Sequence, residues 1–370
     1  MLSNTTASSN TALGAACLLT NTTGAENTAV GSNALTGNTT GSSNVAVGRD
    51  SLVNNTTGSN NTAVGNEALS KNTTGTQNTA VSRAMQLNTT GSYNTSIGMY
   101  STEQNTTGSY NSALGRSALN QNTTGSNNAA FGHQALYANT TANDNAAFGQ
   151  RVLYANTTGS KNVGIGVSAL RANTTGDANA AIGAYALTAN TTGYSNIAIG
   201  DNALKTASTV NRTIAIGDQA MEATTTGSWG VAIGHQALEA QTDANYNVAI
   251  GFAAGKATTT GEYNVFIGGE AGEANTTGGS NTGIGFRSLE ANTTASYNTG
   301  IGFQALTANT TGENNTSLGR GALAANTTAD DNTAVGYRSL STNTVGTRNT
   351  AVGKDAVSYT HLTLPTSDLV

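Results

Sequence analysis

The chain has 370 residues, of which only 9% are charged and 5% aromatic, while 45 are glycine. Large side chains are too scarce to fill an ordinary globular core, so that class of fold is excluded. The net charge of −5, with both signs scattered, also excludes the basic surface that binding to nucleic acid or anionic lipid requires.

One 17-residue unit, NTAVGxxALxxNTTGxx, recurs along the chain with starts from Asn10 to Asn349. We number its positions from 1, the Asn of NTAVG, to 17. Repeats of the TPR, ankyrin or LRR type, which contain helical segments, need longer units than 17 residues. The pattern therefore predicts an all-β fold, a parallel β-solenoid of about 21 coils with one unit per coil.

Each coil is expected to contain two short strands and two turns. NTAVG, with its β-branched residues, predicts the first strand, ALxx predicts the second, and NTTG predicts the returning turn. Stacked coils lie about 4.8 Å apart, so each position becomes a ladder of similar side chains. Neutral Asn and Thr ladders avoid the repulsion that stacked like charges would produce.

The apolar positions suggest which side chains face inward. Position 4 is apolar in every unit, from Leu13 to Val352, and we expect it to fill the interior of the coil. The small position 3, as in Ala29 and Ala46, would then face outward, because side chains alternate along a strand. An outward row of small neutral residues would let other copies approach, which predicts a homotrimer. The alternative is a monomeric solenoid with an inert face.

The unit that starts at Asn78 has 16 residues, because Val81 is followed directly by Ser82 and Arg83. This spacing predicts that the turn glycine of the unit has been deleted.

The segment from Lys205 to Gly272 is the least regular part of the array. Gly255 and Gly272 replace the Leu of position 9, and we expect Phe252 and Phe266 to fill the lost volume. The segment is interpreted as a bend or a specialised patch, with neutral drift as the alternative.

The repeat ends near Val357. Residues 357–370 contain the only proline, Pro365, and resemble the translation of a transposase-type sequencing-library adapter. We expect residues 1–356 to form a single continuous array, and we exclude residues 357–370 from functional reasoning. Met1 falls at position 9, where Met85 and Met221 stand in later units, so the array is expected to be truncated at both ends.

The NTAVGxxAL half of the unit resembles the head repeats of YadA-type trimeric autotransporter adhesins, which carry an N-S/T-x-A-V/I-G signature. The likeness covers Asn4 to Ala356 and implies a left-handed β-roll in a homotrimer. The 17-residue spacing departs from the shorter adhesin spacing. It is closer to arrays in phage tail-fibre-type proteins and in bacterial surface proteins with an endosialidase-type chaperone. The resemblance implies an extracellular location, on a phage virion tail fibre or a bacterial outer surface.

Aromatic residues gather at position 17. Trp229, Tyr246 and Tyr263 lie on successive coils, and Tyr297 follows two coils later. Such a strip could bind sugar rings, because aromatic side chains combine apolar faces with polar tips. The alternative is a structural ladder that packs over a turn.

Other chemistry is not indicated. His133 and His235 share position 6 but lie six coils apart, so we expect exposed histidines rather than metal ligands. Cys17 is the only cysteine, the carboxylates are dispersed, and no Ser is placed with His and Asp in a recurring geometry. We expect no enzymatic activity, no cofactor and no metal.

These observations predict the shaft or head of an extracellular attachment fibre that binds a cell-surface glycan or protein receptor. No nucleic-acid partner is expected, nor any membrane insertion, since no apolar run reaches about 18 residues. One alternative is an ice-binding Thr-rich β-solenoid, although the adjacent Thr residues of NTTG should point to opposite sides. Another is the non-catalytic stalk of a polysaccharide-binding tail spike.

Overall fold

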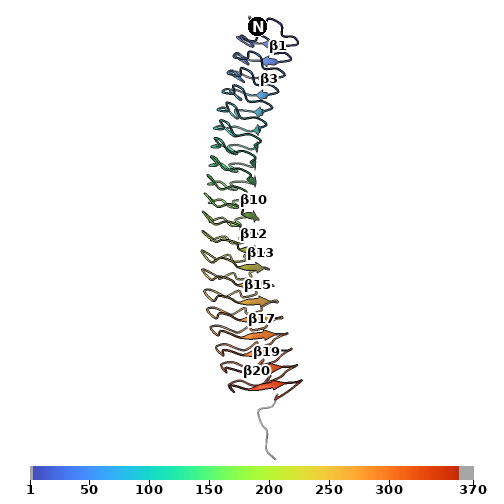
Figure 1. The fold of residues 1–370 in the computed structure, drawn as a ribbon, viewed down its shortest axis with the longest axis vertical. Helices are drawn as coiled ribbons and strands as arrows, with labels where there is room; N and C mark the ends of the chain where they lie inside the picture. Colours follow the sequence, from blue (N-terminus) through green and yellow to red (C-terminus); the bar gives the residue numbers. More distant parts are fainter. Residues whose placement is uncertain (1–2, 358–370) are drawn as a thin grey trace, which may run out of the picture. The chain divides into compact units, whose positions relative to one another are not determined.

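The chain is a parallel β-solenoid in a computed structural model that describes residues 3–357 (Figure 1). It contains 21 strands of three residues each, one per coil, and no helix among the described residues. The coils group into two compact units, Met1–Ser195 and Asn196–Val370. The predicted fold, its parallel pairing and its 17-residue coil are confirmed.

The strands of the first unit are β1 (Thr11–Leu13), β2 (Thr28–Val30), β3 (Val45–Val47), β4 (Thr62–Val64), β5 (Thr79–Val81), β6 (Thr95–Ile97), β7 (Ser112–Leu114), β8 (Ala129–Phe131), β9 (Ala146–Phe148), β10 (Val163–Ile165) and β11 (Ala180–Ile182). Those of the second unit are β12 (Ile197–Ile199), β13 (Ile214–Ile216), β14 (Val231–Ile233), β15 (Val248–Ile250), β16 (Val265–Ile267), β17 (Thr282–Ile284), β18 (Thr299–Ile301), β19 (Thr316–Leu318), β20 (Thr333–Val335) and β21 (Thr350–Val352).

Equivalent positions pair directly within each unit. In β2 and β3, Ala29 lies opposite Ala46 and Val30 lies opposite Val47. The Thr28 amide donates to the Asn44 carbonyl (2.8 Å) at the start of the pair. Equivalent bonds recur from coil to coil, so the ladder of backbone hydrogen bonds runs along the stack of each unit.

The second predicted strand is absent, and this part of the prediction is wrong. The ALxx segment and the residue before it form turns, with positive φ at Asn33 (59°), in position 7, and at Leu35 (52°), in position 9. Alternating left-handed residues cannot form a strand, which needs extended backbone throughout. Hydrogen bonds between coils satisfy this backbone instead: the Asn33 amide donates to the Ala15 carbonyl (2.9 Å) and the Leu35 amide to the Ser51 carbonyl (3.1 Å). The left-handed conformation is costly for leucine, and complete burial of the side chain offsets that cost.

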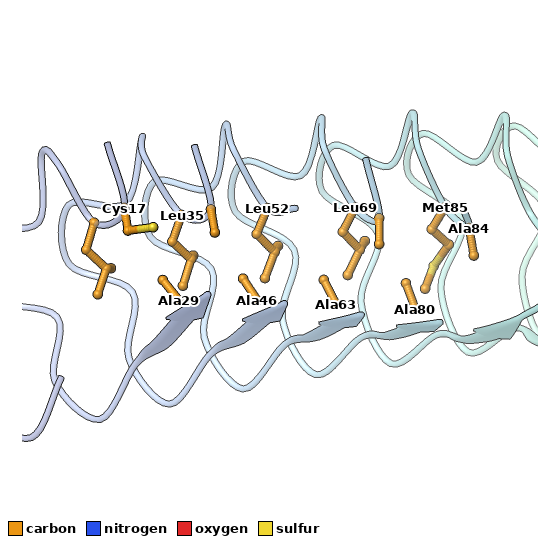
Figure 2. Packing of buried hydrophobic residues seen from close by; sticks show 13 residues of the cluster. Cys17, Ala29, Leu35, Ala46, Leu52, Ala63, Leu69, Ala80, Ala84 and Met85 are labelled. Atoms are coloured by element: carbon orange, nitrogen blue, oxygen red, sulfur yellow. The ribbon is translucent and has the colours of Figure 1, made fainter. Parts of the chain in front are cut away.

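The predicted facing of the strand is also wrong. The central residue is buried in every strand except β1, completely so at Ala29 and Ala46, whereas the position-4 side chain faces outward, as Val64 does at 37% exposure. Figure 2 shows why: the position-9 side chains, including Leu35 and Leu52, reach from the turn across the coil towards the alanines of the strand. One leucine already spans the interior, so only a small residue fits opposite it.

Two ladders of buried asparagine complete the core. At position 1, Asn44 donates from Nδ2 to Gly58 O (2.9 Å), and its own amide donates to Asn27 Oδ1 (3.0 Å). At position 12, Asn55 donates to Asn38 Oδ1 (2.8 Å) and to Gly58 O (2.9 Å). Buried polar groups are stable only when they are hydrogen-bonded, and these side chains are bonded both to neighbouring coils and to the turn.

Glycine at position 5 is required by close approach as well as by backbone conformation. Gly31 has a φ of 129°, and a Cβ added there would lie 2.7 Å from the Gly48 carbonyl carbon of the next coil. In the short unit, Ser82 takes this place, with a φ of 75° and its amide donating to Val64 O (2.7 Å). In other coils the amide of position 7 donates to the carbonyl of position 6 in the preceding coil. The Tyr100 amide donates in this way to Arg83 O, so Arg83 stands at position 6 of the short unit. The deleted residue is therefore position 7, not the turn glycine.

The lost volume at Gly272 is filled by Phe266, and that at Gly255 by Phe266 together with Leu238. Phe266 is fully buried, and a Cβ built at Gly272 would overlap its ring. A Cβ at Gly255 would lie 2.9 Å from the same ring. The expectation for Phe266 is confirmed. That for Phe252 is wrong, because its side chain is 55% exposed.

Candidate binding surfaces

The outward face of the strand column carries an exposed apolar row. It consists of the position-4 side chains, such as Ile233 and Ile250, which are each 37% exposed. In the first half of the second unit, position 2 is also aliphatic, as in Val231 and Val248. Large contiguous apolar patches are rare on monomeric soluble proteins and indicate interaction sites.

This row replaces the surface that the sequence suggested for contact between copies. The alanines of position 3, including Ala29, are buried and cannot meet another chain. The residues available there are instead the larger aliphatic side chains on either side of them.

The aromatic residues of position 17 form a stacked column. The rings of Trp229 and Tyr246 have centroids 6.2 Å apart, and those of Tyr246 and Tyr263 are 5.3 Å apart with planes only 6° from parallel. The Arg212 guanidinium covers the other face of the indole, 4.5 Å from its centroid. Each left-handed residue at this position points its side chain outward from the turn before the strand.

Stacking changes what this column can bind. A ring with neighbours on both sides presents only its edge and its polar tip. Sugar rings stack on aromatic faces, so they cannot stack on a ring inside the column. Exposure follows the number of covered faces: Tyr246, between two rings, is 48% exposed, Tyr263, at the end, is 57%, and the isolated Tyr297 is 64%. Free faces are therefore found at Tyr263 and Tyr297.

Other columns of stacked rings were not singled out from the sequence. Their signal was present, because each pair shares one repeat position on successive coils. The centroid distances are 5.1 to 5.7 Å in Phe131–Phe148, Tyr137–Tyr154, His235–Phe252 and Phe286–Phe303. Tyr93 and Tyr110, which belong to the position-17 aromatics seen in the sequence, stack in the same way at 4.8 Å. Ring stacking is therefore a general property of the array and not by itself a mark of a binding site.

The histidines lie on the surface of their coils. His235 stacks on Phe252, and its Nε2 lies 3.5 Å from Asp218 Oδ2. His133 is half-buried six coils earlier in the repeat. Neither belongs to the one group of three potential metal ligands found among the described residues.

That group consists of Glu270, Glu273 and Glu290, whose carboxylate oxygens lie within 4.8 Å of one another. Arg287 already supplies the positive charge, since its Nε pairs with Glu270 and lies 3.7 Å from Glu290 Oε1. The hydrogen bond with Glu270, together with the charges of Glu270 and Glu290, raises the pKa of Arg287 above its ordinary value. This is a surface ion-pair network, which explains the cluster without a bound ion.

In residues 3–357, no helix has the length and apolar character to cross a membrane. No protein-family model matches the chain, and no curated protein matches it either.

Proposed function

We propose that the chain is the repeat region, shaft or head, of an extracellular attachment fibre that assembles from three copies. The observation that carries this proposal is the exposed aliphatic row of position 4, which each copy would bury against the others. Burial of apolar surface is the main driving force of such association.

The interior of the coils supports a mechanical role. The buried residues are alanine, leucine and hydrogen-bonded asparagine, and they recur at the same positions coil after coil. The side chains that vary from coil to coil lie mostly at the exposed positions. An array of this kind can present a binding surface repeatedly along its length, and multivalent contacts convert weak single affinities into strong attachment. The resemblance to adhesin and tail-fibre repeats favours a phage virion or a bacterial outer surface as its location.

The first test is the oligomeric state. Light scattering coupled to size-exclusion chromatography should give three times the 37.0 kDa chain mass. The triple variant Ile233→Asn, Ile250→Asn and Ile267→Asn should dissociate while its circular dichroism is unchanged. As a control, Thr260→Asn and Thr277→Asn, at the exposed position 14, should remain trimeric. A monomeric wild-type protein would refute the assembly.

The second test is attachment. The fluorescently labelled trimer should bind intact bacterial or host cells, and the dissociated triple variant should bind far less because it loses multivalency. Equal binding by both proteins would show that attachment does not depend on assembly.

A second candidate function is ice binding, which is favoured by the outward facing of positions 2 and 4 of the strand. Position 2 is Thr in several coils, so β2 and β4 present Thr28 beside Val30 and Thr62 beside Val64 on the outward face. These position-2 threonines are better placed to meet ice than the Thr pairs of NTT. In those pairs the first hydroxyl is already used within the chain, as that of Thr39 donates to Thr56 O of the next coil (3.0 Å). Position 2 is Val or Ile in the first half of the second unit, which disfavours an ice-matching lattice there. A freezing-point gap in a thermal hysteresis measurement would establish this function.

A further inference from the structure

The position-17 column of the second unit has a missing ring. Tyr263 ends the stack that begins at Trp229, the next coil carries Ser280, and the coil after that carries Tyr297. The two tyrosines are therefore separated by two coil spacings, about 9.6 Å. No described residue stacks on either ring on the side of Ser280.

The same protein shows what fits between two aromatic rings at this separation. In the position-6 column, Phe303 and Tyr337 are also two coils apart, and Arg320 occupies the coil between them. Its guanidinium carbon lies 5.4 Å from the Phe303 centroid and 5.8 Å from the Tyr337 centroid. In the position-17 column itself, Arg212 stacks on Trp229 in the same way. A planar guanidinium is thus an accepted member of these stacks.

The space left by a missing ring can also be filled by a neighbouring side chain of the same chain. Comparison with Gly269 shows that this has not happened at Ser280. At Gly269 the neighbouring Phe286 covers the vacancy, because a Cβ built there would lie 3.4 Å from its ring. Tyr263 and Tyr297 instead remain the more exposed tyrosines of the second-unit column, at 57% and 64%. Neither ring has closed over Ser280.

The charge around the gap favours a cation. Position 16, next to the column, carries Glu262 in the coil of Tyr263 and Glu313 in the coil after Tyr297. From the coil of Tyr263 to the coil of Glu313, positions 16 and 17 contain no Lys or Arg. Gly279 leaves position 16 of the gap coil without a side chain. Glu262 is one coil from Ser280, with its Oε1 accepting from Asn245 Nδ2 (2.8 Å), and Glu313 is two coils away, about 9.6 Å along the stack. These spacings are about one Debye length or less, so the field of the carboxylates reaches an incoming cation.

We propose that Tyr263 and Tyr297 form an open site for the guanidinium group of an arginine side chain on a partner protein. The guanidinium lies at the level of Ser280, between the two ring faces, where cation–π attraction acts from both sides. The flat shape selects arginine over lysine, because the gap has the thickness of the ring that is missing. The site needs only the coils of the second unit and does not depend on the proposed assembly.

Saturation-transfer NMR on the full chain tests this site with N-acetyl-arginine methylamide as the probe. The δ-methylene protons of the probe should show transfer that is several-fold stronger than that of the matched lysine amide. Ser280→Tyr fills the vacancy with a ring, and Tyr297→Ala removes one wall, so each should reduce the arginine signal several-fold. Tyr110→Ala, which removes a ring at the end of a different stack, should leave it unchanged.

Three outcomes would overturn the proposal. Equal transfer to the lysine amide would show a general cation patch. An undiminished arginine signal in both Ser280→Tyr and Tyr297→Ala would place binding elsewhere. A stronger signal from a glucose oligosaccharide that is lost in the same two variants would identify the gap as a glycan site. A melting curve for each variant separates loss of the site from loss of the fold.

Discussion

Asn38 donates from Nδ2 to Asn21 Oδ1 of the preceding coil at 2.8 Å, and the same nitrogen donates to Gly41 O of its own turn at 2.9 Å. One side chain thus joins two coils and closes a turn. The repetition of this link explains why asparagine, rather than another small polar residue, dominates position 12.

Replacing a member of this ladder should be costly. Asn55→Ala removes the bonds to Asn38 Oδ1 and Gly58 O, and it removes one of the two bonds that Asn72 Nδ2 donates, the other being to Gly75 O. Three buried hydrogen bonds of about 1 kcal/mol each are lost and Asn38 Oδ1 loses its donor, so we expect the free energy of unfolding to fall by about 2–5 kcal/mol. Urea unfolding followed by circular dichroism measures this change. Thr57→Ala, at an exposed position, is the control and should change stability by less than about 0.5 kcal/mol.

The buried asparagines also determine how the NTT sequons behave. Asn38 and Asn55 are fully buried, so an oligosaccharyltransferase cannot reach them in the folded protein. Purified enzyme with a lipid-linked donor should leave the folded chain unmodified and should glycosylate the urea-unfolded chain after dilution. Glycan on the Asn38 peptide of the folded protein, detected by mass spectrometry, would contradict the buried ladder.

The facing of the strand can be tested with one pair of substitutions. Ala46→Leu places a large side chain where Leu52 already spans the coil, and overpacking of this kind costs about 1–3 kcal/mol. Val47→Leu, on the outward side of the same strand, should change the melting temperature little. If Val47→Leu were the damaging change, the interior would lie on the other face.

Phe266 and the two glycines around it should behave as one unit. Phe266→Ala alone opens a cavity and should cost about 3–5 kcal/mol. Gly272→Leu alone should also destabilise, because its side chain would overlap the Phe266 ring. The combined variant Phe266→Ala, Gly255→Leu and Gly272→Leu restores the usual residues at all three positions and should recover most of the loss. Additive losses across this series would show that the three sites are independent.

The period, register and parallel pairing could be predicted from the sequence, because a strict repeat leaves few arrangements that bury every unit equally. The facing could not be predicted from a three-residue strand, since alternation says only that position 3 opposes positions 2 and 4. The sequence did contain a signal for the facing, because the size of the residue at position 3 compensates for the size of residues at positions 8 and 9. A large Phe266 occurs at position 3 where position 9 loses its leucine to Gly272, and Gly164 occurs at position 3 where position 8 carries Val152.

The turn that replaces the second strand was missed for a different reason. Local preference argues against leucine at positive φ, yet Leu35 and its equivalents adopt it in most coils. The cost is offset only by burial and by bonds to the next coil, and these are not visible within a single unit. The aromatic columns could be foreseen from shared positions, but the covering of ring faces by neighbours needed the coil spacing and the ring orientations.

The confinement of each coil's contacts to itself and its two neighbours has a consequence for how such a chain changes length. Removing a block of 17 residues from within either unit brings together two coil surfaces that already fit, with every asparagine finding an equivalent partner. Copying a block does the same in the opposite direction. Recombination between its own repeats can therefore lengthen or shorten the array one coil at a time, and the core of the remaining coils stays the same.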